Sequence, residues 1–129
     1  CIRILPHTGM IEKYFVASDF MVFTSRIECF PKVIQEAMYY ALPIITTPVF
    51  GISEQVYDEV SALFFSPGDA SKLAENIRRI YTDLALRKRL ADNAHDSLAR
   101  MPTLGDMTTR YARLCREAWL SGAGSLDSL

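Results

Sequence analysis

The sequence of 129 residues lacks an excess of charge of either sign and lacks long apolar runs. Its 14 Lys and Arg residues stand against 15 Asp and Glu residues, so the formal net charge is −1. No global field would draw nucleic acid or an anionic membrane to the chain, and we expect no nucleic-acid partner. The apolar runs are far shorter than the roughly 18 residues that span a bilayer. Any anion site must therefore be local.

Paired cysteines are also lacking. Cys1, Cys29 and Cys115 are an odd set, far apart in sequence, and no C-x-x-C pair or histidine stands at metal-ligand spacing. A disulfide framework or a zinc site is therefore not expected. The chain begins without Met and without the features of a signal peptide. We interpret it as a piece of a longer protein, with one partial domain over 1–120 and a flexible tail over 121–129.

Short apolar runs alternate with helical spacings along most of the chain. Continuous apolar runs are typical of strands that are buried on both faces of a sheet. The expected strands are 2–5, 20–24, 44–47 and 62–65. The expected helices are 11–18, 31–41, 52–57, a helical stretch over 70–94 that begins after the cap residue Asp69, and 107–120.

This alternation predicts an α/β fold, an open Rossmann-like parallel sheet with flanking helices and right-handed crossovers. Such sheets bind ligands at the carboxyl ends of their strands. The loops after Leu5, Thr24 and Thr47 should lie at that edge, and function is to be sought there.

The loop after the second expected strand is the most informative of the three. Pro31 suits the first turn of a helix, because its missing N–H would have had no partner there. The N–H groups of Lys32 and Val33 would then point out of the helix start, where they favour a phosphate, and Lys32 adds a positive charge. Glu36 would lie roughly 7.5 Å further along the axis, about the length of a nucleoside diphosphate. Its carboxylate suits the hydroxyls of a ribose, and Glu28 suits those of a sugar that the diphosphate carries.

An ordered set of motifs runs through residues 2–94. It consists of Tyr14-x-x-x-Ser18-Asp19, Ser25-x-x-Glu28-x-Phe30-Pro31, Glu36-Ala37-Met38, Leu42-Pro43-Ile44-Ile45-Thr46, Gly51-x-x-Glu54 and Pro67-Gly68-Asp69. In this order the motifs resemble the retaining glycosyltransferases that include glycogen and sucrose synthases. The hallmark of that family is the E-x7-E pair, which Glu28 and Glu36 match here.

The resemblance implies a GT-B type fold, in which two Rossmann-like domains face each other across a cleft. Positions 1–120 correspond to part of the C-terminal, nucleotide-sugar-binding domain, truncated on its N-terminal side. The implied reaction moves a hexosyl group from a UDP- or GDP-linked sugar to an acceptor held by the N-terminal domain, with retained anomeric configuration and without a metal or other cofactor. We expect a cytoplasmic protein that meets a membrane only through regions outside this chain. The chain by itself should be inactive.

The same resemblance assigns roles to individual residues. Glu28 corresponds to the catalytic-site glutamate that contacts the hydroxyls of the donor sugar near the anomeric centre, and a covalent role is not implied. Glu36 corresponds to the ribose-binding glutamate. The remaining assignments are Cys29 and Phe30 to the sugar, Lys32 and Val33 to the diphosphate, and His7, Thr8 and Gly9 to the nucleobase.

Three features depart from the family pattern. Cys29 and Ala41 stand where glycine is usual, which should narrow the space around them, and the Arg and Lys that clamp the phosphates would precede Cys1. Two alternatives stay open: an epimerase or phosphorylase of the same architecture, and a binding module without turnover. His7 and His95 have no evident carboxylate partner as general bases, so structural or solvent-facing roles are favoured.

Overall fold

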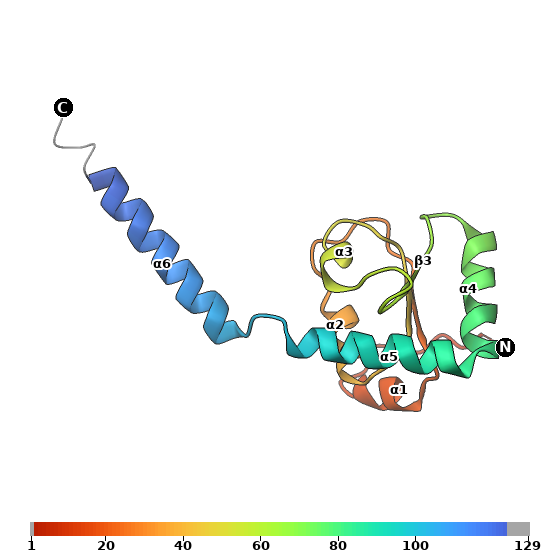
Figure 1. Cartoon of the computed structure of the whole chain (residues 1–129). Coiled ribbons are helices and arrows are strands. Elements are labelled where there is room, and N and C mark those ends of the chain that lie inside the picture. Colours follow the sequence, from red (N-terminus) through yellow and green to blue (C-terminus); the bar gives the residue numbers. More distant parts are fainter. Residues whose placement is uncertain (1, 124–129) are drawn as a thin grey trace. The chain divides into compact units, whose positions relative to one another are not determined.

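Three short parallel strands form the sheet of the first of two compact units. The computed structural model describes residues 2–123, and these divide after Ala99 into a first and a second unit. The strands are β1 (Met21–Phe23), β2 (Ile44–Thr46) and β3 (Leu63–Phe64), in that spatial order. Met21 pairs with Ile44, and Ile45 pairs with Leu63. The predicted parallel α/β arrangement is therefore confirmed (Figure 1).

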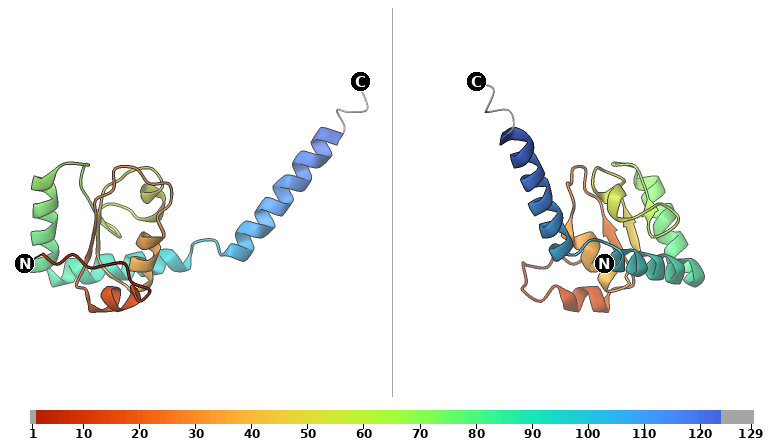
Figure 2. Two further views of the ribbon diagram at one scale, coloured as in Figure 1. Left: turned by 180° about the vertical axis from the view of Figure 1, so that it is seen from behind. Right: turned by 60° about the vertical axis from the view of Figure 1, so that its left-hand side comes forward.

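Helices connect and flank these strands. The first unit contains α1 (Glu12–Ala17), α2 (Lys32–Tyr39), α3 (Ile52–Gln55), α4 (Ala70–Thr82) and α5 (Leu84–Ala99), and the second contains α6 (Leu104–Ala123). As predicted, Asp69 caps α4, because its carboxylate accepts a hydrogen bond of 2.9 Å from the Lys72 N–H. Helices α2 and α4 lie on opposite sides of the sheet, and α5 packs against both (Figures 1 and 2).

The core lies around β2, which is buried along its whole length. A strand pairs with it on either side, and its successive side chains point to opposite faces. On the face of α4, a buried cluster joins the strands to α4 and α5 through Ile45, Leu63, Phe65, Ile80, Leu86 and Leu90. Ile34, Ala37 and Met38 of α2 are buried as well. Burial on both faces fixes the orientation of β2 and of the loop that follows it.

Two predictions about strands are wrong. Residues 2–5 form no strand, and Ile2 and Ile4 are 93% and 95% exposed. Strand β1 is an edge strand rather than one buried on both faces, with Val22 36% exposed. An apolar segment needs a backbone partner to become a strand, and residues 2–5 have none. Because no strand within residues 2–123 pairs with the outer side of β1, β1 has a partner on one side only.

The end of α6 overlaps the predicted tail. Ser121–Ala123 are helical, whereas the rest of 121–129 lies outside the described residues. None of the helices within residues 2–123 combines the length and the apolar character that crossing a bilayer requires.

Candidate functional site

The loops that follow the three strands meet at one edge of the sheet. Because β1, β2 and β3 are parallel, the loops 24–31, 47–51 and 65–69 all leave from their carboxyl ends. Helix α2 begins at this edge, after the first of these loops (Figure 1). The edge that the sequence indicated is therefore where the predicted site residues of loop 24–31 and α2 are found.

The start of α2 carries unpartnered N–H groups. The sequence predicted Pro31 as the first helical residue, but Pro31 has an extended conformation with ψ 126° and is the cap residue. The helix therefore begins one residue later than predicted, at Lys32. No side chain of the described residues caps the helix, and the Ile34 N–H turns back to the Pro31 carbonyl at 3.3 Å. Within residues 2–123 the N–H groups of Lys32 and Val33 have no hydrogen-bond acceptor. The helix dipole and the exposed Lys32 make this a suitable position for an anion.

Two carboxylates stand on either side of this helix start. Glu28 is half-buried in the loop before α2, and its Oε1 accepts a hydrogen bond of 3.0 Å from the Ser25 hydroxyl. Glu36 is exposed on α2, one turn after Lys32, which corresponds to about 6 Å along the helix axis. A ligand with an anionic centre and hydroxyl groups on both sides would match this arrangement.

Cys29 and Phe30 lie between Glu28 and the helix, and both are exposed. The Cys29 carbonyl packs against the backbone of Gly51, in the loop after β2. A Cβ atom at Gly51 would lie 1.5 Å from the Cys29 oxygen and 3.3 Å from the Phe30 ring, so any side chain there would displace the loop. The close approach explains a glycine at position 51.

Two further residues support the same loop, and the sequence did not single them out. The hydroxyl of Thr47, directly after β2, donates to the Ser25 carbonyl at 2.5 Å. The Gln55 side-chain amide in α3 donates to the Pro31 carbonyl at 3.2 Å. Both side chains are buried. The motifs near them were Leu42-Pro43-Ile44-Ile45-Thr46 and Gly51-x-x-Glu54, and neither motif includes Thr47 or Gln55.

The turn proposed for the nucleobase is not joined to this group. Within the described residues its recorded hydrogen bond is local, from the Met10 N–H to the Thr8 hydroxyl at 3.1 Å, and none links His7, Thr8 or Gly9 to loop 24–31. The structural role favoured for His95 agrees with its contacts. Its Nδ1 lies 3.1 and 3.2 Å from the carbonyls of Met38 and Tyr39, at the end of α2.

Two hollows lie at opposite ends of the strands, one at their carboxyl ends and one at their amino ends. A cleft of about 300 Å³ opens at the carboxyl edge, between the ends of β1 and β3 and the start of α4, and Thr24 and Arg26 line it. A larger hollow of about 640 Å³ lies at the amino edge, between α1, the turn before β2 and α5. Within residues 2–123 no group of three or more His, Cys, Asp or Glu side chains is arranged to hold a metal ion.

Comparisons with known proteins agree on one family. Residues 2–97 match the family described as glycosyl transferases group 1. The chain is 27% identical to the alpha-D-kanosaminyltransferase of Streptomyces kanamyceticus over 118 residues, which are 88% of this chain and 31% of that protein. It is 30% identical to a lipopolysaccharide core biosynthesis glycosyltransferase of Rhizobium meliloti over 101 residues, 78% of this chain and 30% of the relative.

Solved structures share the fold. The sucrose-phosphate synthase of Thermosynechococcus elongatus superposes with a TM-score of 0.75 and 28% identity, over 86% of this chain and 28% of that one. Anabaena HepE, solved with UDP-glucose, superposes with a TM-score of 0.74 and 24% identity, over 81% of this chain and 29% of that one. The chain thus spans about a third of the length of the curated relatives it matches. Because the family match covers most of its residues, the chain belongs to the group 1 glycosyltransferases, as a GT-B type Rossmann-like domain.

Proposed function

We propose that this chain is the nucleotide-sugar-binding part of a retaining hexosyltransferase that uses a UDP- or GDP-linked sugar. The observation that carries the proposal is the uncapped start of α2 with Glu28 before it and Glu36 one turn into it. The N–H groups of Lys32 and Val33 would hold the diphosphate, and Glu36 would accept hydrogen bonds from the ribose hydroxyls. Glu28 would hold the sugar, together with the backbone N–H groups of Cys29 and Phe30.

In the proposed reaction the bond between the anomeric carbon and the diphosphate breaks first. The sugar then carries oxocarbenium-like charge. The acceptor attacks the face from which the diphosphate leaves and gives its proton to that diphosphate, so the new bond forms with retained configuration. The negative charge that develops on the diphosphate faces the start of α2 and Lys32, and fixed N–H groups stabilise such charge without reorganisation. No metal is needed in this scheme.

The acceptor is assigned to a second domain outside this chain, and the phosphate-clamping Arg and Lys are assigned to strands of this same domain that would precede Cys1. The short share of its relatives' length that the chain covers supports this assignment. The nucleobase is assigned to the turn His7, Thr8 and Gly9. We expect the chain to bind the donor without transferring its sugar.

Calorimetric titration tests the proposal. UDP, GDP and their hexose derivatives are titrated into the parent chain and into Glu36→Ala. Each hydrogen bond to a carboxylate is worth about 1.5–3 kcal/mol, so loss of the ribose contacts should raise Kd about ten- to hundredfold for the nucleotide and the nucleotide sugar alike.

Glu12→Ala, an exposed helical glutamate of α1, serves as the matched control and should leave both constants unchanged. A parent chain that binds none of the four ligands would refute the donor site. A Glu36→Ala variant with parental affinity would refute the ribose assignment alone.

A further inference from the structure

The segment after β2 supports loop 24–31 at three separate points. Thr47 donates to the Ser25 carbonyl, Gly51 packs against the Cys29 carbonyl, and Gln55 donates to the Pro31 carbonyl. We call residues 47–55 the supporting segment. It touches the loop at its beginning, its middle and the start of α2, and none of its three contacts is local, because 22 or more positions separate each pair.

The first contact leads to the carboxylate of Glu28. Thr47 is fully buried, and its hydroxyl lies 2.5 Å from the Ser25 carbonyl oxygen, which fixes the backbone of Ser25. The Ser25 hydroxyl in turn lies 3.0 Å from Glu28 Oε1 and 3.1 Å from the Ile27 carbonyl. The direction in which Glu28 presents its carboxylate is therefore set through Ser25 by Thr47.

The third contact leads to the helix start. Gln55 is 1% exposed, and its Nε2 donates to the Pro31 carbonyl at 3.2 Å, while its Oε1 has no partner within the described residues. The same carbonyl accepts the Ile34 N–H, so Gln55 holds the first turn of α2 in place. The N–H groups of Lys32 and Val33 belong to that turn.

We propose that Thr47 and Gln55 are positioning residues for two different parts of the donor, Thr47 for the sugar through Glu28 and Gln55 for the diphosphate through the start of α2. This inference rests on the proposed function. It adds that Thr47 and Gln55 affect different parts of the donor, because they position residues that contact different chemical groups. A purely structural role of Thr47 would instead weaken the binding of both ligands or of neither, and for Gln55 the discriminating observation is whether its loss changes residues 32–34 rather than 25–28.

The experiment compares Kd for UDP with Kd for UDP-glucose, or for the matching GDP pair if the parent chain prefers guanine. Thr47→Val keeps the shape and removes the hydroxyl. It should raise Kd for the nucleotide sugar about three- to tenfold and leave Kd for the nucleotide within twofold, because one neutral hydrogen bond contributes about 0.5–1.5 kcal/mol. Thr47→Ser, which keeps the hydroxyl, should restore the parental ratio. Gln55→Leu should weaken both ligands by the same factor.

Thr46→Val is the matched control. Thr46 precedes Thr47 in the chain, is equally buried, and its hydroxyl is directed to the Thr47 carbonyl at 3.5 Å rather than to the loop. Thr46→Val should leave the ratio of Kd for the nucleotide sugar to Kd for the nucleotide unchanged. Thermal melting of each variant shows whether a change in affinity follows a change in stability.

A second readout needs no ligand. In amide NMR spectra Thr47→Val should shift the signals of residues 25–28, whereas Gln55→Leu should shift those of residues 32–34. The inference is overturned if Thr47→Val weakens both ligands equally, leaves both unchanged, or leaves the signals of 25–28 in place. A parent chain that binds no nucleotide and no nucleotide sugar refutes the proposed function, and with it this inference.

Discussion

Ala41 ends helix α2 in a backbone conformation that glycine adopts more easily. Its N–H donates to the Met38 carbonyl at 3.1 Å and the Leu42 N–H donates to the Ala37 carbonyl at 2.9 Å, the hydrogen-bond pair of a Schellman motif. The φ of Ala41 is 49°, in the left-handed region. Ala41 is exposed and lines the hollow of about 640 Å³ at the amino ends of the strands. Alanine in this left-handed conformation strains the backbone, and glycine would not.

Ala41→Gly should therefore stabilise the chain. Relief of the left-handed strain gives about 1–2 kcal/mol, and the greater freedom of glycine in the unfolded chain offsets part of it. The free energy of unfolding should rise by about 0.5–1 kcal/mol, measured by urea denaturation. Ala85→Gly is the control, an exposed alanine in the right-handed helix α5, and it should lower the stability. A loss of stability in Ala41→Gly would contradict the strain argument.

Residues with a local signal were predictable from the sequence, and residues with a distant partner were not. Pro31 before a helical spacing indicated the start of α2, and the distance from Glu28 to Glu36 could be counted along the chain. Thr47 and Gln55 meet the loop across 22 and 24 positions of sequence. Nothing in the residues around them specifies those contacts, because they arise only when β1 and β2 pair.

At the scale of elements, the position of a segment in the sheet decided what its apolar pattern meant. β1 and β2 have similar apolar sequences, yet β2 is central and buried while β1 lies at an edge. Residues 2–5 have the same pattern and form no strand. Apolar runs identify segments that can be strands, and the available partners determine which of them are.

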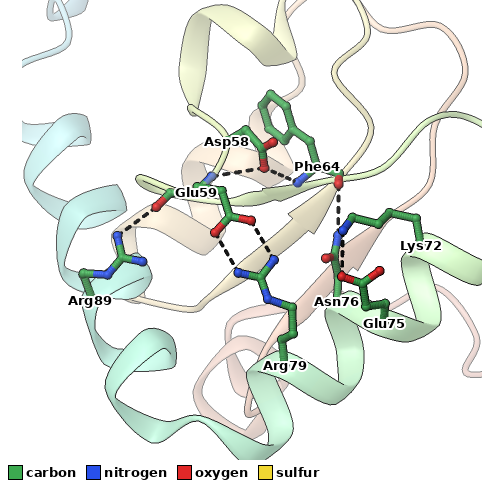
Figure 3. A network of polar contacts seen from close by, with 8 residues as sticks. All are labelled: Asp58, Glu59, Phe64, Lys72, Glu75, Asn76, Arg79 and Arg89. Carbon is green, nitrogen blue, oxygen red and sulfur yellow. Dashed lines mark hydrogen bonds and ion pairs between the residues drawn. The ribbon is translucent and has the colours of Figure 1, made fainter.

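The turn before β3 is held to α4 and α5 by charged side chains (Figure 3). The Arg79 guanidinium binds both carboxylate oxygens of Glu59 at 2.6 and 2.8 Å, and Arg89 donates to the Glu59 carbonyl at 2.8 Å. Asp58 accepts the Phe64 N–H at 2.8 Å. These bonds keep Glu59 in place although its φ is 58°. The turn is thereby fixed to the helices that cover β3.

This pair predicts a dependence of stability on pH. The hydrogen bond from Arg79, aided by its charge, lowers the pKa of Glu59 below its ordinary value. A lowered folded-state pKa contributes stability that is fully present above the ordinary pKa of glutamate, about 4.3, and is lost as the pH falls through the folded-state value. Because both side chains are partly exposed, the contribution is at most about 1 kcal/mol.

Glu59→Gln isolates this contribution. The parent chain should be more stable than the variant at pH 7, and the difference in free energy of unfolding should shrink below pH 4 and approach zero when Glu59 is protonated. Urea denaturation at several pH values measures it. A difference that stays constant from pH 7 to about pH 3 would show that the charge of Glu59 is not involved.

At the scale of the whole molecule, the two units differ in what they bury. Helix α5 closes the first unit with Leu86, Leu90, Ala91 and Ala94 buried. In the second unit, every residue from 102 to 121 is exposed. The sequence predicted helix in both regions, although it did not separate α5 from α4. Helical spacing reports an apolar stripe and does not report whether anything covers it. Which stripe becomes core depends on tertiary contacts that no local pattern contains.

Helix α6 is amphipathic, and residues at its own N-terminus cap it. Leu104, Met107, Tyr111, Leu114 and Ala118 follow one another at spacings of three or four residues and form one face. Thr103 and Asp106 form a reciprocal cap, in which the Asp106 carboxylate accepts the Thr103 N–H at 2.9 Å and the Thr103 hydroxyl accepts the Asp106 N–H at 3.2 Å. A cap and helix propensity give a helix of this length only marginal stability in water.

The two units should therefore differ in amide hydrogen exchange. Amides of β2 and of the buried turns of α2 should exchange through global unfolding, more slowly by orders of magnitude than those of α6, which open locally. Mass-spectrometric exchange at pH 7, followed at two protein concentrations, measures this. Slow exchange of α6 that appears only at the higher concentration would mean that a second copy covers the apolar face. Slow exchange at both concentrations would contradict the marginal stability expected of α6 by itself.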